Sequence, residues 1–291
     1  MKEKTEPQPI HKTNWNHLII LDACRYDVFK EIYEEKYKEE IGGKLNKIKS
    51  RGSSTPDWLS KTFIDQYPYT YISANPFINS LGLPLSKTST GFKSNWNPSK
   101  TFKKVIDLWN TEWNESKQTV LPEKVMETAK EHKEEKTIIH LLQPHAPFLT
   151  ADLGGSSWMG RKRAKAEEGE EEYSTKRKIL DIVFKVVRPI WRKLPETKQY
   201  KIRKILGIQE YNPIIEYYQK GKIDEIKKYY KENLDIAMEE VTKFIEKVPK
   251  GKKVIITADH GEAFGEQGNF GHPQNSDNPV LREVPWLEIE K

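Results

Sequence analysis

The sequence predicts an α/β fold with a mostly parallel central β-sheet. Short apolar runs end in polar residues, and between them lie segments whose apolar side chains recur at helical spacing. Strands that alternate with helices in this way form parallel sheets with helices on both faces. The predicted strands are residues 17–21, 69–74, 137–142 and 253–257.

The predicted elements follow one another in a regular order. The first apolar run ends in Asp22, and after a polar turn a helical pattern extends to residue 37. Further helices are predicted at residues 122–135 and 229–248, where apolar residues recur at near-helical spacing. Residues 282–289 are predicted to form an edge strand near the end of the sheet.

One segment departs from this alternation of strands and helices and is predicted to be a helical insertion. Residues 154–228 begin with glycines and serines and continue into a charged run with few large apolar residues. The later part, residues 178–206, suits amphipathic helices that cap the site or lie on an acidic or lipid surface. A helical excursion packed on the main domain is the alternative. Residues 1–16 are polar and predict a disordered lead-in to one domain of residues 17–291.

Length and composition fit one large soluble domain. The chain has 291 residues, of which 36% are hydrophobic, so it can bury a substantial core. Cys24 is the only cysteine, which excludes an intramolecular disulfide, and we expect a cytoplasmic location. The net charge of +6 is spread over a mixed surface, so nucleic acid is not an expected partner. No apolar run reaches the roughly 18 residues of a membrane helix.

Carboxylate and imidazole side chains follow the predicted strands at their carboxyl ends. Asp259 and His260 follow the strand at residues 253–257, and Asp22 follows the first strand. Because the carboxyl ends of parallel strands meet at one edge, we expect these side chains to lie together. Carboxylate oxygen and imidazole nitrogen are suitable ligands for Zn, Mn or Ca. The sequence therefore predicts a divalent metal site, with a solvated loop start as the alternative.

A run of hydroxyl side chains offers a nucleophile for this site. Ser54 and Thr55 follow Gly52, which suits a tight turn, and precede the helix-compatible residues 58–63. A helix N-terminus favours an anion, and metal coordination makes a hydroxyl nucleophilic near neutral pH. An ordinary helix cap with a proline at the first helical position is the alternative interpretation.

Two histidines lie in loops rich in glycine and proline. His145, between two prolines, could donate a hydrogen bond to a phosphoryl or sulfuryl oxygen, or protonate a leaving group. His272, after Gly271, could complete a second metal site or bind the substrate anion. Arg25, in the turn after the first strand, is a candidate for substrate binding. The histidines interpreted as structural or solvent-facing are His11, His17, His132 and His140.

Motifs in a fixed order span residues 17–290 apart from the insertion. They are Leu21-Asp22-Ala23-Cys24-Arg25-Tyr26-Asp27, Ser54-Thr55-Pro56, Gln143-Pro144-His145-Ala146-Pro147-Phe148, Asp259-His260-Gly261-Glu262 with Gly265-Glu266, and Gly271-His272 followed by Val284-Pro285. In this order they resemble the alkaline phosphatase superfamily, and within it the sulfatase-like branch. The resemblance implies an alkaline-phosphatase-like three-layer sandwich and a sulfatase-like catalytic domain.

The resemblance also implies an activity and roles for individual residues. The implied activity is hydrolysis or transfer of a phosphate or sulfate ester through a covalent intermediate on a serine or threonine. By position, Asp22, Asp259 and His260 match the superfamily's metal ligands, Ser54 its nucleophile and His145 its substrate-contacting histidine.

Two departures separate the chain from formylglycine sulfatases. These carry Cys or Ser, any residue, Pro, any residue and Arg, whereas Trp58 stands here in place of the arginine. Ala23 follows Asp22, so the paired aspartates of sulfatase calcium sites are missing. The site is therefore more similar to phosphotransferase or phosphodiesterase relatives with an unmodified Ser or Thr. Thr55 is the alternative nucleophile to Ser54.

The function that follows is a metal-dependent hydrolase or transferase acting on phosphate or sulfate esters. The expected substrate is a small-molecule, glycan or lipid-linked ester, and peripheral membrane contact through the insertion stays open. The alternative is a non-catalytic member of the superfamily that binds anionic glycans or lipid headgroups through the basic insertion.

Overall fold

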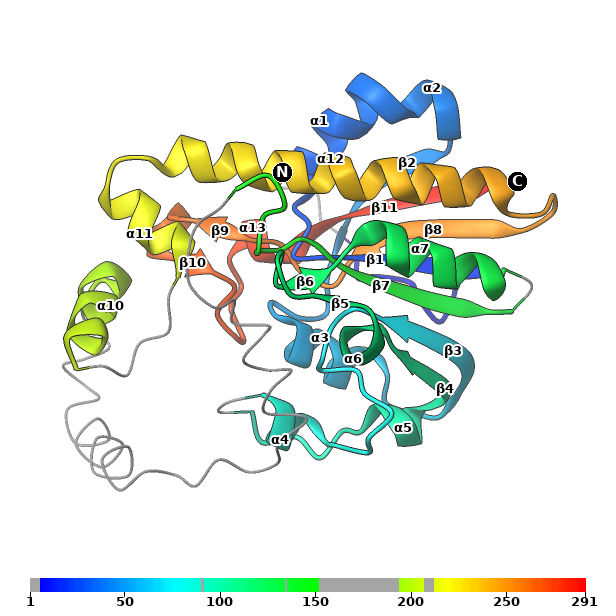
Figure 1. The fold of residues 1–291 in the computed structure, drawn as a ribbon, viewed down its shortest axis with the longest axis horizontal. Helices are drawn as coiled ribbons and strands as arrows, with labels where there is room; N and C mark the ends of the chain where they lie inside the picture. The colour runs from blue at the N-terminus through cyan, green and yellow to red at the C-terminus, as the bar shows by residue number, and fades with distance from the viewer. Residues whose placement is uncertain (1–5, 90–91, 134, 152–193, 207–211) are drawn as a thin grey trace.

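A seven-stranded sheet forms the centre of the protein. The computed structural model describes residues 6–89, 92–133, 135–151, 194–206 and 212–291. The strand order is β2-β11-β8-β1-β7-β3-β4 (Figure 1). Strands β8, β1, β7, β3 and β4 are parallel to one another, and β11 is antiparallel to its neighbours β8 and β2. The predicted α/β fold with a mostly parallel sheet is therefore confirmed.

The strands of the main sheet are β1 (His17–Asp22), β2 (Lys44–Lys49), β3 (Tyr67–Ser73), β4 (Phe102–Asp107), β7 (Thr137–Pro144), β8 (Lys253–Ala258) and β11 (Glu283–Glu290). Two short pairs are β5 (Trp113–Asn114) with β6 (Thr119–Val120), and β9 (Ala263–Phe264) with β10 (Phe270–Gly271). The helices are α1 (Tyr26–Ile32), the π-helix η1 (Tyr33–Tyr37), α2 (Lys38–Ile41), α3 (Thr55–Thr62), α4 (Leu85–Thr88), α5 (Pro98–Thr101), α6 (Leu108–Thr111), α7 (Pro122–Glu131), α10 (Glu196–Ile205), α11 (Pro213–Gln219), α12 (Ile223–Lys247), the 3-10 helix η2 (Glu266–Gly268) and α13 (Pro279–Arg282).

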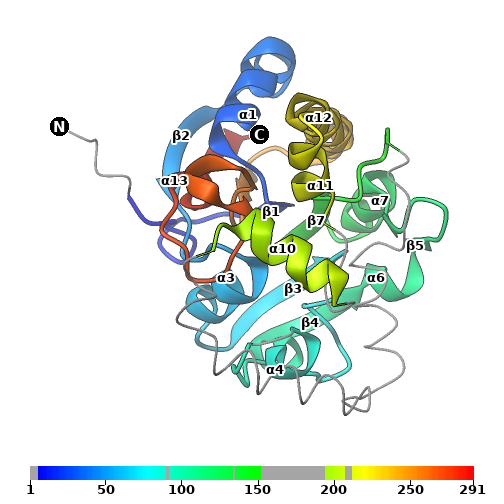
Figure 2. The same cartoon turned by 90° about the vertical axis from the view of Figure 1, so that its left-hand side faces the viewer.

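Helices cover both faces of the central strands. Helices α7 and α12 lie on one face and α3 lies on the other (Figure 2). Every residue of β1 and β7 is buried. Their nearly continuous apolar sequences follow from this double burial, because a strand covered on both sides has no polar face. The carboxyl ends of these strands, where polar residues begin, therefore lie at the edge of a rigid core.

Strand β11 lies inside the sheet, which corrects the prediction of an edge strand at residues 282–289. It pairs with β8 on one side and β2 on the other, so β2 forms the edge. Strand β2 was not predicted from the sequence. Most of the polar side chains in its sequence, Lys-Leu-Asn-Lys-Ile-Lys, are exposed. A lysine-rich edge strand protects the sheet against pairing with other chains, and the same lysines hide its apolar pattern.

Residues 6–16 pack against the sheet, so the prediction of a disordered lead-in is wrong for this part of the chain. Ile10 and Trp15 are buried in the main core. The buried Gln8 side chain donates from Nε2 to the Ala258 carbonyl at 2.7 Å, and its Oε1 accepts from the Trp58 indole at 2.7 Å. These contacts join helix α3 to the end of β8.

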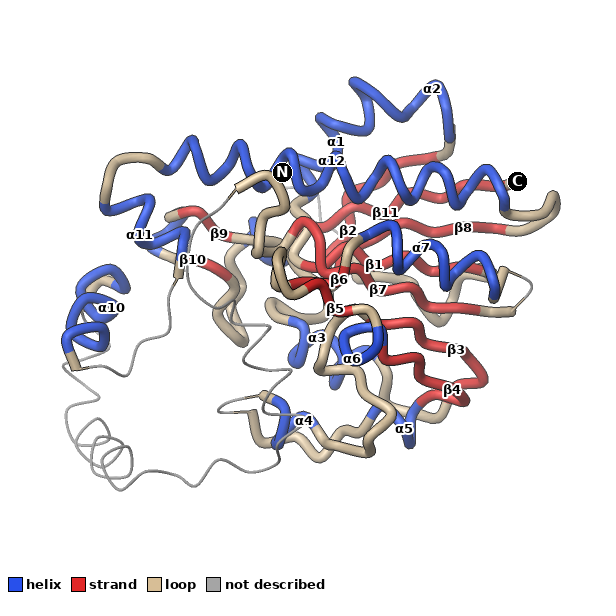
Figure 3. The backbone as a smooth tube through the Cα atoms, in the orientation of Figure 1, coloured by secondary structure: helices blue, strands red, loops and turns tan. Residues whose placement is uncertain are grey.

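The expected insertion at residues 154–228 lies partly outside the described residues, and of the predicted amphipathic segment only the end is seen, as α10. Helix α12 begins at Ile223, before the expected end of the insertion. Helices α10 and α11 lie at the same end of the molecule as β9 and β10 (Figure 3). None of the described helices has the length and apolar character needed to cross a membrane. A second apolar group, here called the satellite cluster, consists of Phe148, Tyr200, Ile214, Ile215, Ile226, Tyr230, Phe264 and Phe270.

Candidate active site

Two carboxylates and an imidazole meet at the carboxyl ends of β1 and β8. The strands pair in parallel up to Leu21 and Ala258, which brings Asp22 beside Asp259 and His260. The Nε2 atom of His260 lies 3.7 Å from Asp22 Oδ1 and 3.4 Å from Asp259 Oδ2. All three side chains are buried. The predicted convergence of these residues is therefore present in the structure.

The hydroxyl that faces this group belongs to Thr55, the first residue of α3. Its Oγ1 lies 3.4 Å from His260 Nε2. The Ser54 hydroxyl is buried but forms no hydrogen bond to any described residue, and it does not cap α3. Gly52 lets the turn before α3 pack closely against the backbone of that helix, because a Cβ atom at residue 52 would lie 2.2 Å from the Trp58 backbone nitrogen. We refer to Asp22, Thr55, Asp259 and His260 as the strand-end cluster.

The strand-end cluster contains buried oxygens that lack hydrogen-bond partners among the described residues. These are Asp22 Oδ1 and Asp259 Oδ2, the same atoms that approach His260 Nε2. Burial, and then the Asp259 charge, raise the pKa of Asp22. Paired buried carboxylates of this kind need a compensating cation. A set of carboxylate oxygen, imidazole nitrogen and hydroxyl oxygen donors fits a divalent metal ion.

Backbone and amide groups orient each of these ligands. Asn75 donates to Asp22 Oδ2 at 2.7 Å, which turns the other oxygen toward His260. The Ala23 and His260 backbone N–H groups both donate to Asp259 Oδ1, at 3.1 and 2.9 Å. The Nδ1 of His260 donates to the Gly261 carbonyl at 2.8 Å, so its Nε2 carries the lone pair toward the cluster. The cluster is therefore preorganised for a cation.

His140, interpreted from the sequence as structural or solvent-facing, is fully buried beside Asp22. Its Nδ1 shares a hydrogen bond of 2.9 Å with the Tyr71 hydroxyl, and its Nε2 lies 3.8 Å from Asp22 Oδ2. Burial lowers the pKa of His140 from 6.5 to about 4, so the ring is neutral. The ligand atoms of Asp22, His140 and Asp259 lie within 4.8 Å of one another. His140 is thus a nitrogen donor within reach of the metal site.

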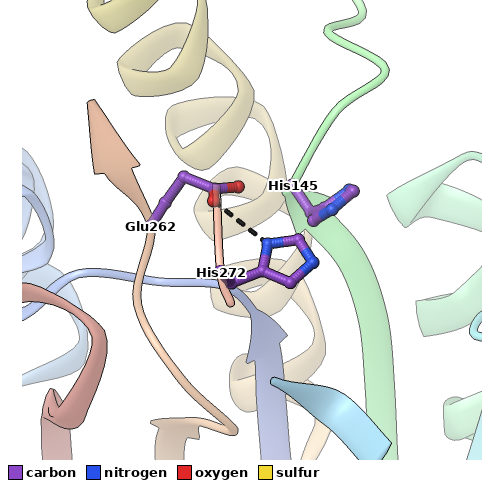
Figure 4. Close-up of side chains that lie close together, drawn as sticks. All are labelled: His145, Glu262 and His272. Atoms are coloured by element: carbon purple, nitrogen blue, oxygen red, sulfur yellow. Dashed lines mark hydrogen bonds and ion pairs between the residues drawn. The ribbon is translucent and has the colours of Figure 1, made fainter. Parts of the chain in front are cut away.

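His145, Glu262 and His272 form a second group, which we call the loop cluster (Figure 4). Glu262 Oε1 accepts from His272 Nδ1 at 3.0 Å, and the His272 ring centroid lies 5.0 Å from that of His145. The His272 ring also lies 4.7 Å from the His260 ring, so the two clusters adjoin. His272, expected from the sequence to complete a second metal site or to bind the substrate anion, lies in this second group.

The charges in the loop cluster support one another. Burial works to lower the pKa of His272, but the charge and hydrogen bond of Glu262 raise it above its usual value. Burial works to raise the pKa of Glu262, but His272 lowers it. Burial, and then the neighbouring His272, lower the pKa of His145. Glu262 therefore favours the protonated form of His272, whereas burial favours the neutral form of His145. Glu262 belongs to one of the ordered motifs, but no role for it was predicted from the sequence.

Arg25 is occupied by two carboxylates and one backbone carbonyl. Its guanidinium pairs with Asp27 at 2.7 Å and Glu266 at 2.6 Å, and it donates to the Glu262 carbonyl at 3.3 Å. Arg25, the candidate substrate-binding residue, thus supports the backbone of Glu262, and its guanidinium group is already paired with carboxylates.

Comparisons with known proteins place this arrangement in a known fold. No family model matches the chain, and no curated protein matches its sequence. The soluble domain of lipooligosaccharide phosphoethanolamine transferase A from Neisseria meningitidis is 12% identical, with a TM-score of 0.52 over 94% of this chain and 75% of that chain. The C-terminal periplasmic domain of EcEptC from Escherichia coli, in complex with Zn, is 11% identical, with a TM-score of 0.50 over 96% of this chain and 74% of that chain. The chain has the alkaline-phosphatase-like fold.

A third similar structure is the C-terminal periplasmic domain of phosphoethanolamine transferase EptC from Campylobacter jejuni. It is 13% identical, with a TM-score of 0.47 over 98% of this chain and 79% of that chain. The alkaline-phosphatase-like fold implied by the motif order is confirmed by the similarity to the Neisseria meningitidis and Escherichia coli domains. The expected cytoplasmic location is corrected, because the similar Escherichia coli domain is periplasmic. A lone cysteine fits an oxidising compartment equally well, since one thiol cannot form an intramolecular disulfide.

Proposed function

We propose that this alkaline-phosphatase-like chain transfers or hydrolyses a phosphate ester, with a divalent metal ion bound by the strand-end cluster and Thr55 as the nucleophile. The observation that carries the proposal is the position of the Thr55 hydroxyl, 3.4 Å from His260 Nε2 and beside carboxylate oxygens that lack hydrogen-bond partners among the described residues. Asp22, Asp259 and His260 would hold the metal. Ser54 was the first choice of nucleophile from the sequence. In the structure, the hydroxyl that lies beside His260 is that of the next residue, Thr55.

The proposed reaction is an in-line displacement at phosphorus. The Thr55 hydroxyl loses its proton to solvent water, and its oxygen forms a new bond to phosphorus as the bond to the leaving-group oxygen breaks, which leaves a phosphoryl group on Thr55. The bound metal would lower the pKa of the hydroxyl and offset charge on the phosphoryl oxygens. His272, oriented by Glu262, donates a hydrogen bond to the phosphoryl oxygens or a proton to the leaving group, and His145 can do the same only when its Nε2 is protonated, because its Nδ1 bonds to the Ala146 carbonyl. Water or an acceptor alcohol then takes the phosphoryl group from Thr55.

Several observations favour phosphate over sulfate and zinc over other metals. Trp58 occupies the place of the arginine in the formylglycine sulfatase pattern, and Cys24 lies elsewhere, buried after β1. The similar Escherichia coli domain is a complex with Zn, and oxygen and nitrogen donors suit that ion. The similar Neisseria meningitidis enzyme is a lipooligosaccharide phosphoethanolamine transferase, so we propose a glycan or lipid-linked phosphate ester as the substrate.

We also propose that α10, in the described part of the expected insertion, covers one side of the site. The support is that Glu196 of α10 accepts from the Phe270 backbone N–H at 3.2 Å, close in sequence to His272. A cap in this place would shield the phosphoryl group from bulk water.

The proposal is tested with purified protein stripped by a chelator and reloaded with Zn, Mn or Ca. Substrates are p-nitrophenyl phosphate, bis-p-nitrophenyl phosphate and p-nitrophenyl sulfate, and mass spectrometry detects a phosphoryl group on a tryptic peptide. We expect metal-dependent turnover of a phosphate ester and a phosphopeptide that contains Thr55. Thr55→Ala should reduce turnover by about 10³-fold or more, whereas the matched control Ser54→Ala should stay within about fivefold of wild type.

The same experiment distinguishes the alternatives. A phosphoryl group on Ser54, or activity in Thr55→Ala, would remove Thr55 from the mechanism. If the protein neither binds metal nor turns over any of these esters, the result would favour the non-catalytic binding protein. Metal analysis also decides the role of the loop cluster, because one ion per chain fits substrate binding there and two ions fit a second metal site.

A further inference from the structure

Helix α12 directs two buried polar side chains toward the candidate site. Tyr230 and Asn233 are three positions apart, which places them on one face of the helix. Both are almost completely inaccessible to solvent. The helix itself packs on α7 and β7, so it is a rigid support for whatever these side chains hold. Neither residue belongs to the strand-end cluster or the loop cluster.

Asn233 holds the loop that carries His145. Its Oδ1 accepts from the Leu149 backbone N–H at 3.0 Å. Its Nδ2 lies within hydrogen-bond distance of the carbonyl groups of Pro144, His145 and Pro147, at 3.2, 3.1 and 3.3 Å. Pro144 is the last residue of β7 and the others follow it, so the amide bonds to backbone groups at and just beyond the end of the strand. One side chain thus fixes the backbone on both sides of His145.

Tyr230 holds the turn that follows Asp22. Its hydroxyl donates to the Ala23 carbonyl at 2.6 Å and accepts from the Arg25 backbone N–H at 2.9 Å. Ala23 has a φ angle of 59°, a left-handed conformation that L-residues rarely adopt, so the turn needs outside support. The His145 backbone N–H donates to the Asp22 carbonyl at 3.2 Å, which links the two supported segments.

We propose that Asn233 is a positioning residue for His145 and that Tyr230 plays the matching part for the Asp22 turn. The proposal rests on the proposed function, because it says that one face of α12 holds the loop cluster in line with the strand-end cluster. The chemistry requires an amide at residue 233, since a carboxylate there would accept from Leu149 but repel three carbonyl oxygens. Loss of the amide should let His145 move while the metal ligands stay in place.

The test compares Asn233→Ala, Asn233→Asp and Tyr230→Phe with Thr242→Val. Thr242 is buried on the same helix, and its hydroxyl has no hydrogen-bond partner among the described residues, which makes it a matched control. For each folded variant, kcat and KM for the phosphate ester and the zinc affinity are measured. Asn233→Ala should reduce kcat by about 10- to 100-fold, with zinc affinity within about twofold of wild type.

The other variants should give different patterns. Asn233→Asp should reduce kcat at least as much as Asn233→Ala, and Thr242→Val should match wild type. Tyr230→Phe should weaken zinc binding by about tenfold, because it frees the turn that carries Asp22. Unchanged kcat in Asn233→Ala, or an equal loss of zinc affinity in Asn233→Ala and Tyr230→Phe, would overturn the proposal. If Asn233→Asp fails to fold, Asn233→Ala decides.

A readout that needs no activity separates this proposal from the proposed function. The imidazole ¹⁵N resonances of His145, assigned with His145→Gln, should shift in Asn233→Ala and stay unchanged in Thr242→Val. If wild type turns over no ester, the proposed function fails, and these resonances still test whether Asn233 positions His145. Unchanged resonances in Asn233→Ala would contradict the positioning role even in an active enzyme.

Discussion

The strand-end cluster is buried at the edge of the main core, whereas the loop cluster lies on segments outside or at the end of the main sheet. Asp22 and Asp259 stand at strand ends, and Thr55 begins a helix packed on the opposite face from α12. His145 and His272 lie on loops that are partly exposed. The first group is held by sheet pairing, and the second by the satellite cluster and by polar side chains of α12.

This difference suggests a division of labour within the site. A metal ion needs ligands at fixed distances, and strand ends in a close-packed core change little. Groups that contact a substrate must admit it and release the product, so loops held by a smaller cluster suit them better. Variants that separate metal binding from turnover therefore test whether the two clusters differ in function as they differ in construction.

The largest effect is expected from Asp259→Ala. Removal of this ligand should abolish both zinc binding and ester turnover, with a residual rate below about 10⁻³ of wild type. Metal content is measured by mass spectrometry after dialysis, and turnover with the phosphate ester. His145→Gln is the comparison, because it removes a loop-cluster residue and should retain the metal. Full activity in Asp259→Ala, or loss of metal in His145→Gln, would break the distinction between the clusters.

A smaller effect is expected from Glu262→Gln. The change removes the charge that pairs with His272 while it keeps a similar shape, so kcat should fall by about 10- to 100-fold and zinc affinity should change little. The matched control is Glu135→Gln, because Glu135 pairs with His132 in the same way at an exposed position. Steady-state kinetics and zinc titration check both variants. An equal loss of activity in the two would point to a general effect of removing a glutamate charge.

The smallest effect is expected on stability, from His140 beneath the strand-end cluster. Burial lowers the pKa of His140 to about 4, while an unfolded chain binds that proton near pH 6.5. The unfolded state therefore binds the proton first as the pH falls. The stability due to neutral His140 is complete above about pH 6.5 and is lost progressively toward pH 4, by on the order of 3 kcal/mol.

His140→Asn removes this titration and keeps a polar partner for Tyr71. The free energy of unfolding of the variant, from urea titrations of metal-free protein, should therefore fall less steeply between pH 7 and pH 4.5 than that of wild type. The comparison uses the pH slopes, since the substitution also changes packing at every pH. Parallel slopes would mean that His140 is accessible to protons in the folded state.

The sequence predicted the residues at strand ends and missed those that act across long distances. Asp22, Asp259 and His145 follow apolar runs that are buried on both faces, so the strands and their polar ends could be located from the pattern alone. Thr55 could not be chosen over Ser54, because one position along α3 decides which hydroxyl faces His260.

Other residues gave no local signal. In strand β4, with the sequence Phe-Lys-Lys-Val-Ile-Asp, lysines interrupt the apolar pattern, as they do in β2. Gln8, Asn75 and Asn233 are ordinary polar residues in the sequence, and they become important only through partners far along the chain. A buried amide can be found from the fold but not from composition, because its partners are backbone groups.

The pairing of β1 with β8 joins segments from distant parts of the chain, since Ala23 and Asp259 are 236 positions apart. Contacts of such long sequence separation form late in folding, because a large loop must close first. The ligands therefore do not come together in the unfolded polypeptide, and the ion can bind only after the sheet has formed. Bound metal should thus slow unfolding far more than it speeds folding, and chelation should shorten the lifetime of the native state.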